Sequence, residues 1–271
     1  MFASFKIFGR LFTLMMLCFA VAACATPPVD PDELVIYEEI NDPIEPFNRS
    51  MFGLNETLDH MFFKPAALVY DGVLPVFVQD MVLNFTRYLN TPRILLNDVL
   101  QGNSQNASDT VGRFMLNSLT LGLFDPAAGA GIQYHDEDFG QTMAVWGVAE
   151  GPYLVLPIFG PKTVRSATGN VVDIYLNPIN HYAENTDRNW ITWTRWALDH
   201  IDWRARQVDQ IDDLRETSLD FYATVRSLYR QNRQNMVENR ENQNSGLDGQ
   251  SLSYDFEDEI DVLDAELGTI E

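Results

Sequence analysis

The sequence predicts an all-α fold, a single domain of amphipathic helices interrupted at glycine and proline. Apolar residues recur at intervals of three and four along most of the chain, the period of a helix with one buried face. No alternation of apolar and polar residues is long enough to indicate a β-sheet, and no internal repeat occurs. Thirteen Pro and 16 Gly divide the 271 residues into helical stretches. At 46% hydrophobic residues, the chain can bury a core.

The first predicted helix begins near Asp42-Pro43-Ile44-Glu45, where a capping Asp precedes an early Pro and an acid. Pro46 leaves this boundary uncertain by several residues. The helix carries an apolar stripe that Lys64-Pro65 interrupts. The members of the stripe are Phe47, Met51, Leu54, Leu58 and Met61.

Three helices are expected between residues 78 and 118. The first carries Val78, Met81, Val82, Phe85, Tyr88 and Leu89. Thr91-Pro92 is a cap followed by Pro and predicts a new helix, which Gly102 closes. The third carries Ala107, Val111, Phe114, Met115 and Ser118.

The next region is irregular and rich in glycine and proline. We expect one short helix around Phe139 to Trp146, then brief pieces that include the apolar run Tyr153 to Leu156. A stripe from Val164 to Tyr175 predicts a further helix that ends at Asn177-Pro178. Beyond the tryptophans at 190–203, apolar residues between 208 and 229 predict one or two long helices.

Residues 1–23 are typical of an export signal. Lys6 and Arg10 precede a thirteen-residue uncharged run from Leu11 to Ala23. As a helix this run would measure roughly 20 Å, which is short for a membrane crossing and suitable for a signal peptide.

The signal ends in Val21-Ala22-Ala23-Cys24, which resembles the lipobox of bacterial lipoproteins. In that motif the cysteine thiol receives a diacylglycerol and becomes the first residue of the mature chain. Cys18 does not fit, because Leu17 before it is bulky. Since Ala25 and Thr26, and no Asp, follow Cys24, we expect the outer membrane and its periplasmic face. The alternative is an ordinary cleaved signal with an incidental cysteine.

Charge and composition define the two ends of the mature chain. Residues 24–41 carry Pro27, Pro28 and Pro31 with several acids and indicate a lipidated tether, and residues 42–241 form the predicted helical domain. Residues 242–271 form an acidic tail, which we expect to be disordered. The formal charge of −21 argues against nucleic acid as a partner. Only three of the 18 cations are lysines, Lys6, Lys64 and Lys162.

No group of residues in the sequence indicates a catalytic site, a metal site or a cofactor site. His135-Asp136-Glu137-Asp138 is dense in metal-capable side chains, but a second ligand group is missing, and acids before Phe139 suit a helix start. A nucleophile elbow is absent, and Gly129-Ala130-Gly131 is only a fragment of a nucleotide-binding pattern. Four Trp at 190–203 with Arg195 among them suit a lipid headgroup boundary or an ordinary aromatic core equally well.

Several motifs in a fixed order resemble the MlaA (VacJ) family, from about residue 41 to residue 230. The first half of them is Asn41-Asp42-Pro43-Ile44-Glu45-Pro46-Phe47-Asn48-Arg49, Leu100-Gln101-Gly102, Gly112-Arg113-Phe114, Asn117-Ser118 and Gly122-Leu123-Phe124-Asp125. The second half is Asp138-Phe139-Gly140-Gln141-Thr142, Val145-Trp146-Gly147-Val148, Gly151 to Pro157, Gly160-Pro161, Val164-Arg165 and Ser218 to Tyr222 with Val225-Arg226. Phe221 stands where the family commonly has Pro.

The resemblance implies a ring-like helical body in the periplasmic leaflet of the outer membrane, associated with a porin trimer. Such a protein removes mislocalised phospholipids from the outer leaflet through an amphipathic channel and passes them to a soluble periplasmic carrier, which maintains lipid asymmetry. Alignment to the family implies that Arg195 faces the channel, with Trp193 and Trp196 beside it. A lipoprotein phospholipase and a porin-associated scaffold are the alternative functions.

Overall fold

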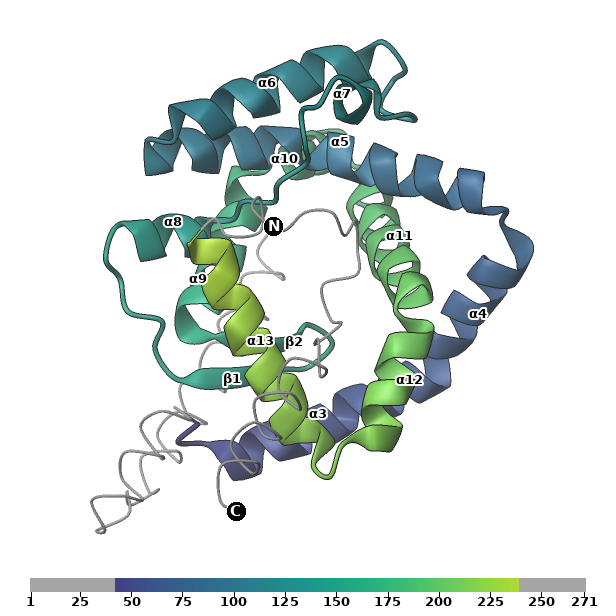
Figure 1. The fold of residues 1–271 in the computed structure, drawn as a ribbon, viewed down its shortest axis with the longest axis vertical. Coiled ribbons are helices and arrows are strands. Elements are labelled where there is room, and N and C mark those ends of the chain that lie inside the picture. Colours follow the sequence, from purple (N-terminus) through teal and green to yellow (C-terminus); the bar gives the residue numbers. More distant parts are fainter. Residues whose placement is uncertain (1–41, 239–271) are drawn as a thin grey trace, which may run out of the picture.

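The structure, a computed structural model, describes residues 42–238. In Figure 1 its helices follow one another round a ring, with the β1–β2 hairpin at its lower edge. The helices are α3 (Glu45–Leu58), α4 (Lys64–Val73), α5 (Val76–Gln101), α6 (Ser104–Ser118), α7 (Pro126–Gly129), α8 (Phe139–Val145), α9 (Val164–Leu176), α10 (Pro178–Asn185), α11 (Trp190–Arg206), α12 (Val208–Thr217) and α13 (Phe221–Val237). The predicted signal peptide, Cys24, the tether and the acidic tail lie outside the described residues.

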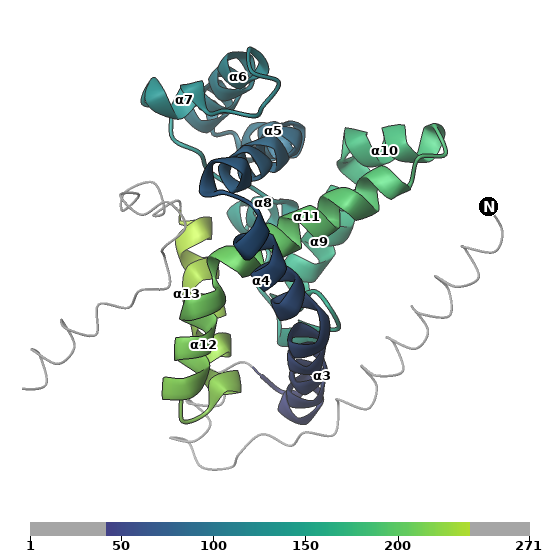
Figure 2. The same ribbon diagram turned by 90° about the vertical axis from the view of Figure 1, so that its right-hand side faces the viewer.

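The ring is closed by contacts between elements distant in sequence. Helix α3 packs on β1, α5 on α8, and α4 on α11, while α13 contacts both α8 and β2. Figure 2 shows α10 and the adjoining end of α11 extending to the side opposite α12 and α13. No helix within residues 42–238 combines the length and apolarity that a bilayer crossing requires.

Two asparagines join α3 to the hairpin as if α3 were a neighbouring strand. Asn48 Nδ2 donates to the Tyr153 carbonyl at 3.0 Å, and its Oδ1 accepts from the Val155 amide at 2.9 Å. Asn55, two turns later, binds the Leu156 carbonyl at 2.9 Å and the Ile158 amide at 2.7 Å in the same way. These side chains therefore satisfy backbone groups that would otherwise be unpaired at a sheet edge.

Asp42 has a different role from the predicted helix cap. The N-cap of α3 is Ile44, without a side-chain hydrogen bond. The buried Asp42 carboxylate instead accepts hydrogen bonds from Asn48 at 2.7 Å, from Arg226 at 2.7 Å and from Tyr222. Asp42 thus ties the start of the domain to α13, the last helix, and closes the ring.

Two prolines that the sequence marked as helix boundaries lie within continuous helical segments. Before Pro65 the chain forms a π-helical turn, Asp59–Phe63, in which the Lys64 amide reaches back to the Asp59 carbonyl. Pro92 lies inside the 26-residue helix α5, so Thr91 is no cap and the two helices predicted there are one. A proline removes one backbone hydrogen bond, and packing along both sides of the helix outweighs that loss here.

The antiparallel hairpin β1 (Tyr153–Leu156) and β2 (Gly160–Thr163) was not expected from the sequence. Tyr153, Leu154 and Val155 are all buried, so no alternation is visible in a strand of four residues. Helix α10 is a second unexpected element, and its eight residues are too few for a clear stripe. The all-α class holds, because this hairpin is the only sheet in the described part of the chain.

Other expected boundaries are confirmed. Gly102 ends α5 in the left-handed conformation at φ 74°. Asp138 caps α8 in a capping box with Gln141, as expected for an acid at a helix start. The helix predicted from Val164 is α9, and the C-terminal stripe divides into α12 and α13.

Helices α8 and α9 cross at two glycines. A Cβ added to Gly169 would lie 2.3 Å from the Gly140 amide nitrogen. Only glycine allows this close approach of two backbones, and the contact positions the start of α8 beside α9.

Candidate functional site

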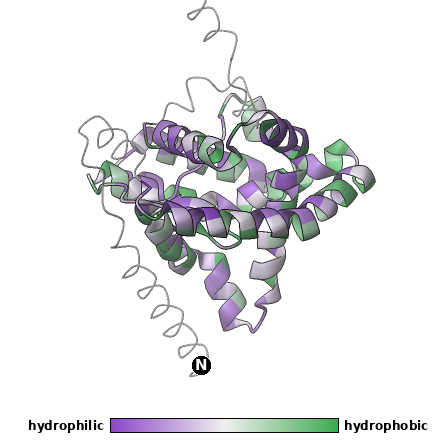
Figure 3. Cartoon of the chain, turned by 90° about the horizontal axis from the view of Figure 1, so that it is seen from below, coloured by the Kyte–Doolittle hydropathy of each residue, from purple (hydrophilic) through white to green (hydrophobic). Residues whose placement is uncertain are grey.

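Polar residues predominate among the buried side chains of residues 42–238. Among residues 42–238, 22 polar or charged side chains are buried and only eight hydrophobic ones are, whereas 31 large hydrophobic side chains are exposed. Figure 3 shows hydrophobic and hydrophilic residues along the same helices all round the molecule, with no separate hydrophobic layer. A water-soluble domain has the opposite distribution, with apolar side chains buried and polar ones exposed. The distribution found here is typical of a protein that contacts lipid or another apolar surface.

The exposed apolar side chains are dense at the corner between α4 and α5. Val69, Val73, Val76 and Phe77 are 65–70% exposed there. Leu119 and Leu121, between α6 and α7, are more exposed still. We call these six residues the apolar rim. Large apolar side chains exposed to this degree favour a surface that contacts lipid or another protein.

Arg195 lies on α11 and faces α5. Its Nη2 donates a hydrogen bond to Oδ1 of Asn90. Burial lowers the pKa of Arg195, and the neighbouring Asp199 opposes that shift. Arg93 on α5 and Tyr134 also act on Arg195 electrostatically, and the bond to Asn90 places the guanidinium between α11 and α5.

The two tryptophans named with Arg195 lie in different surroundings. Trp193 is 69% exposed. Trp196 packs against His200, with ring centroids 4.2 Å apart, and edge-on against Phe63 and Phe159. Trp196 therefore belongs to an aromatic cluster, and Trp193 belongs to the exposed apolar surface.

Four cations come from four different elements of the ring. We call Arg93 of α5, Lys162 of β2, Arg195 of α11 and Arg233 of α13 the inner basic cluster. Lys162 lies within electrostatic range of Arg93 and Arg233, and Arg195 lies within range of Arg93. Arg93 Nη2 lies 2.5 Å from an Asp136 oxygen, and Arg233 holds Asp138 with two bonds of 2.6 Å.

The side chains of His135 to Asp138 bind different partners and do not converge on one point. His135 Nε2 bonds buried Asp98 at 3.1 Å, Asp136 pairs with Arg93, and Glu137 accepts from Gln101 at 2.7 Å. No group of three metal-capable side chains converges within residues 42–238. These residues fasten α5 to the start of α8.

Two of these groups have shifted pKa values. Burial raises the pKa of Glu137 to about 7, helped by the negative charge of Asp98 and opposed by the Gln101 hydrogen bond. Burial disfavours protonated His135, but its hydrogen bond to Asp98 and the nearby carboxylates outweigh burial and raise its pKa.

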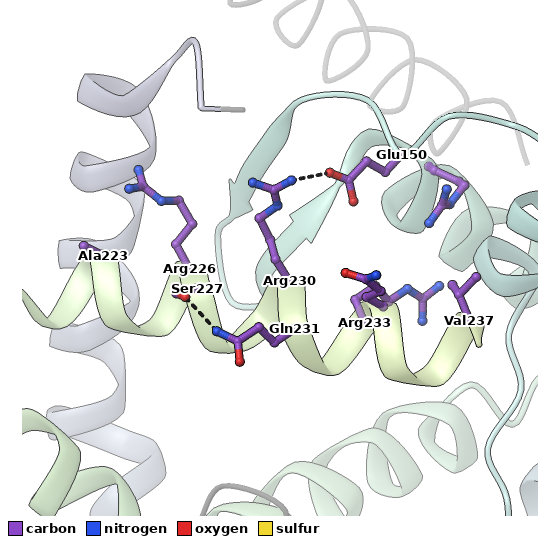
Figure 4. A pocket seen from close by; sticks show the side chains of 10 residues that line it. Glu150, Ala223, Arg226, Ser227, Arg230, Gln231, Arg233 and Val237 are labelled. Carbon is purple, nitrogen blue, oxygen red and sulfur yellow. Dashed lines mark hydrogen bonds and ion pairs between the residues drawn. The ribbon is translucent and has the colours of Figure 1, made fainter. Parts of the chain in front are cut away.

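A cavity of about 730 Å³ lies along α13, on the face that Figure 4 shows. Four arginines line it, Arg165, Arg226, Arg230 and Arg233, together with Glu150. Arg230 pairs with Glu150 at 2.9 Å, while Arg226 and Arg233 pair with carboxylates of other elements. Arg226, Arg230 and Arg233 thus join α13 to other elements of the ring.

Sequence reasoning missed Arg93 and Lys162. Arg93 follows Pro92 in what looked like the first turn of a helix, and Lys162 lies in a glycine- and proline-rich stretch. Only the ring topology brings both side chains to one place. The rarity of lysine in this chain is the one sequence signal that singles out Lys162.

A family model for the MlaA lipoprotein matches residues 40–236. The chain belongs to the MlaA family. An uncharacterised protein of Rickettsia prowazekii is 36% identical over 208 residues, which cover 75% of this chain and 81% of that relative. The intermembrane phospholipid transport system lipoprotein MlaA of Shigella flexneri is 33% identical over 199 residues, 70% of this chain and 75% of that protein.

A solved structure has the same fold. It is described as the structural basis for maintenance of bacterial outer membrane lipid asymmetry, and it superposes with a TM-score of 0.65 at 32% sequence identity. The match covers 72% of this chain and 98% of that one. The all-α ring is thus the MlaA fold.

Proposed function

We propose that this chain is a lipoprotein of intermembrane phospholipid transport. It removes mislocalised phospholipids from the outer leaflet of the outer membrane through the interior of the ring, and thereby maintains lipid asymmetry. The observation that carries this proposal is the inverted distribution of side chains in residues 42–238, in which many polar side chains are buried and many large apolar ones are exposed. Its relatives named as phospholipid transport lipoproteins support the same function.

The physical task of such a protein is to move a charged headgroup past a hydrocarbon layer. An unassisted phosphate would have to give up its water, at a large cost in free energy. The inner basic cluster offers hydrogen-bond donors and positive charge in place of that water. The apolar rim lets the body sit among acyl chains without a membrane-spanning helix in the described residues.

The proposal includes the anchor and the partners. Cys24 carries the acyl chains that hold the body at the periplasmic face of the outer membrane. A porin trimer holds the ring within the leaflet, and a soluble periplasmic carrier takes the lipid from it. None of these steps needs covalent chemistry by the protein, a cofactor or a metal.

Phospholipase activity is the enzymatic alternative, and a porin-associated scaffold is the structural one. A phospholipase would release fatty acid from labelled phospholipid. A scaffold would leave the lipid barrier intact in cells from which the gene is deleted.

The experiment is a comparison of cells with and without the gene. Surface phosphatidylethanolamine is labelled with an amine reagent that does not cross the outer membrane. Deletion should raise the labelled phospholipid severalfold, and a plasmid copy should restore the low level. Equal labelling in both strains would contradict the transport function, and released fatty acid would favour the phospholipase.

A further inference from the structure

Lys162 lies on the face of the β1–β2 hairpin opposite to that of Tyr153. In the β1–β2 register Lys162 lies opposite Leu154, so both side chains share one face of the hairpin. The other face carries Tyr153, which packs edge-on against Tyr222 and Tyr229 of α13. Lys162 is thus directed away from the aromatic contact that fixes the hairpin in place.

The charged neighbours of Lys162 belong to four different elements of the ring. It interacts electrostatically with Asp138 at the start of α8, Arg233 of α13, Arg93 of α5 and His200 of α11. Burial among these elements lowers the pKa of the Lys162 ammonium. The side chain nevertheless keeps contact with solvent, since it is only partly buried. Lys162 therefore lies deep in the molecule and still borders an accessible space.

Lys162 also lacks a partner of its own. Among residues 42–238, no hydrogen-bond acceptor or carboxylate lies within bonding distance of its Nζ, whereas Lys64 Nζ bonds Asp212 at 2.6 Å. The two nearby carboxylates, Asp136 and Asp138, are each held by a guanidinium.

The carboxylates near Lys162 already have bonded partners. Arg93 holds Asp136, and Arg233 holds Asp138. Asp173, which lies near Arg93 and Asp138, accepts hydrogen bonds from Asn97 at 3.1 Å and from the Phe139 amide at 2.9 Å. Among these charged groups, Lys162 is the one without a bonded partner in residues 42–238.

We propose that Lys162 is a phosphate-binding residue of the ring interior, and that its ligand is the phosphodiester group of a phospholipid in transit. A phosphodiester carries one negative charge, and its oxygens can accept hydrogen bonds from Nζ. Arg93, held on Asp136, lies within electrostatic range of Lys162 and adds to the attraction for the phosphate. This assignment rests on the proposed transport function and names the position where the headgroup pauses.

The two described lysines make an internally controlled experiment possible. Purified full-length protein in a maltoside detergent is treated with a trace of isotopic acetic anhydride, and acetylation of Lys162 and Lys64 is measured by mass spectrometry. Three additions are compared, namely phosphatidylglycerol in mixed micelles, diacylglycerol and inorganic phosphate. Phosphatidylglycerol at about ten times its Kd should lower acetylation of Lys162 roughly tenfold and leave that of Lys64 unchanged.

The other two additions identify the source of the phosphate. Diacylglycerol should give no protection, because it lacks a phosphate. Equal protection by inorganic phosphate at the same concentration would indicate a free-phosphate site and overturn the lipid assignment. Unchanged acetylation of Lys162 with phosphatidylglycerol would overturn the binding role altogether.

Variants provide an independent measurement. Lys162→Met should lower binding of radiolabelled phosphatidylglycerol about tenfold, and Lys162→Arg should restore most of it, with an unchanged thermal unfolding transition in each. Lys64→Met, which breaks the Asp212 ion pair, should bind lipid normally. Normal lipid binding by Lys162→Met would contradict the proposal.

The site and the proposed function can fail separately. If lipid protects Lys162 while gene deletion leaves the outer leaflet free of phospholipid, the site stands and the transport function fails. If deletion exposes phospholipid while Lys162 is not protected, the transport function stands and this site fails.

Discussion

The charged side chains of the interior are held by specific neighbours, and this determines what each can do. Arg93 and Arg233 form ion pairs with Asp136 and Asp138, so their guanidinium groups are less available to bind a ligand. Arg195 is held by a neutral amide, Asn90, and Lys162 has no bonded partner among the described residues. A passing phosphate thus meets cations that are fixed in position and only partly neutralised.

Arg195→Glu tests whether this cation contacts the lipid. Replacing attraction by repulsion changes one charge contact at 4 Å by several kcal/mol, with about 4 kcal/mol at an effective dielectric of 20 as an upper guide. Transfer of fluorescent phospholipid out of proteoliposomes should fall about tenfold or more. Arg195→Lys should do less harm, because it keeps the charge and loses only the planar fork.

The matched control for this variant is Arg188→Glu. Arg188 is exposed before α11 and bonds only the Tyr182 hydroxyl in the described structure, so its reversal should leave transfer unchanged. In Arg195→Glu, the new repulsion between the introduced carboxylate and Asp199, one turn on, should cost only a few tenths of a kcal/mol of stability. Transfer at the wild-type rate by the Arg195→Glu variant would reject a channel role for this residue.

Glu137 should make the stability of the ring depend on pH. Its pKa is about 7 in the folded chain against 4.5 for an ordinary Glu, so the folded state binds the proton more tightly. Its contribution to stability is therefore full below pH 4.5 and is lost as the pH rises to 7. The free energy of unfolding should fall by up to about 1.4 kcal/mol per pH unit in that window.

Glu137→Gln should remove this slope, since the amide keeps an oxygen for Gln101 and does not ionise. Urea unfolding between about pH 5 and 6.5 measures the effect below the range in which His135, with its raised pKa, contributes. Glu184→Gln on α10, an exposed carboxylate, is the control. Identical pH slopes for Glu137→Gln and the wild type would show that burial of Glu137 does not perturb its protonation.

At the scale of elements, close helix contacts and side-chain bonds to the hairpin hold the ring closed. Gly169→Ala should destabilise the fold by about 1–3 kcal/mol, because the added Cβ meets the backbone of Gly140 and forces α8 away from α9. Gly53→Ala is the control, since its Cβ would meet nothing within 4 Å, and it should raise stability by about 0.5–1 kcal/mol. Chemical unfolding of both variants gives the comparison, and a fully stable Gly169→Ala would refute the close contact.

The sequence predicted the helices whose stripes are long, and it failed where tertiary contacts decide. α6, α8 and α9 follow from periodicity and caps. Pro65 and Pro92 indicated helix ends. Instead, a π-helical turn precedes Pro65, and Pro92 lies inside α5. The hairpin was missed because its stability comes from Asn48 and Asn55, which lie about a hundred residues earlier.

In the candidate site, too, some residues could be predicted from local sequence and others depend on tertiary contacts. Arg195 could be named from its place among aromatic residues and its family alignment. Lys162 and Arg93 could not, because nothing local in the sequence shows that β2 and α5 face one space. That information exists only in the closed topology.

At the scale of the whole molecule, the proposed position at the outer membrane requires an anchor. Cys24→Ser should block lipidation, because a hydroxyl is far less ionised than a thiol near neutral pH. Growth with radiolabelled fatty acid should label the wild type and leave the variant unlabelled. Cys18→Ser is the control and should be labelled normally, while a labelled Cys24→Ser protein would contradict the lipobox.

The central claim is that phospholipid passes through the ring, and photocrosslinking tests it most directly. Phospholipid with a photoactivatable group near the phosphate is incorporated into membranes that contain the full-length protein, and the crosslinked peptides are mapped by mass spectrometry. We predict crosslinks on the inner segments, β2 around Lys162 and α11 around Arg195, in addition to the apolar rim. Crosslinks confined to the apolar rim, such as to Phe77 and Leu119, would contradict passage through the ring.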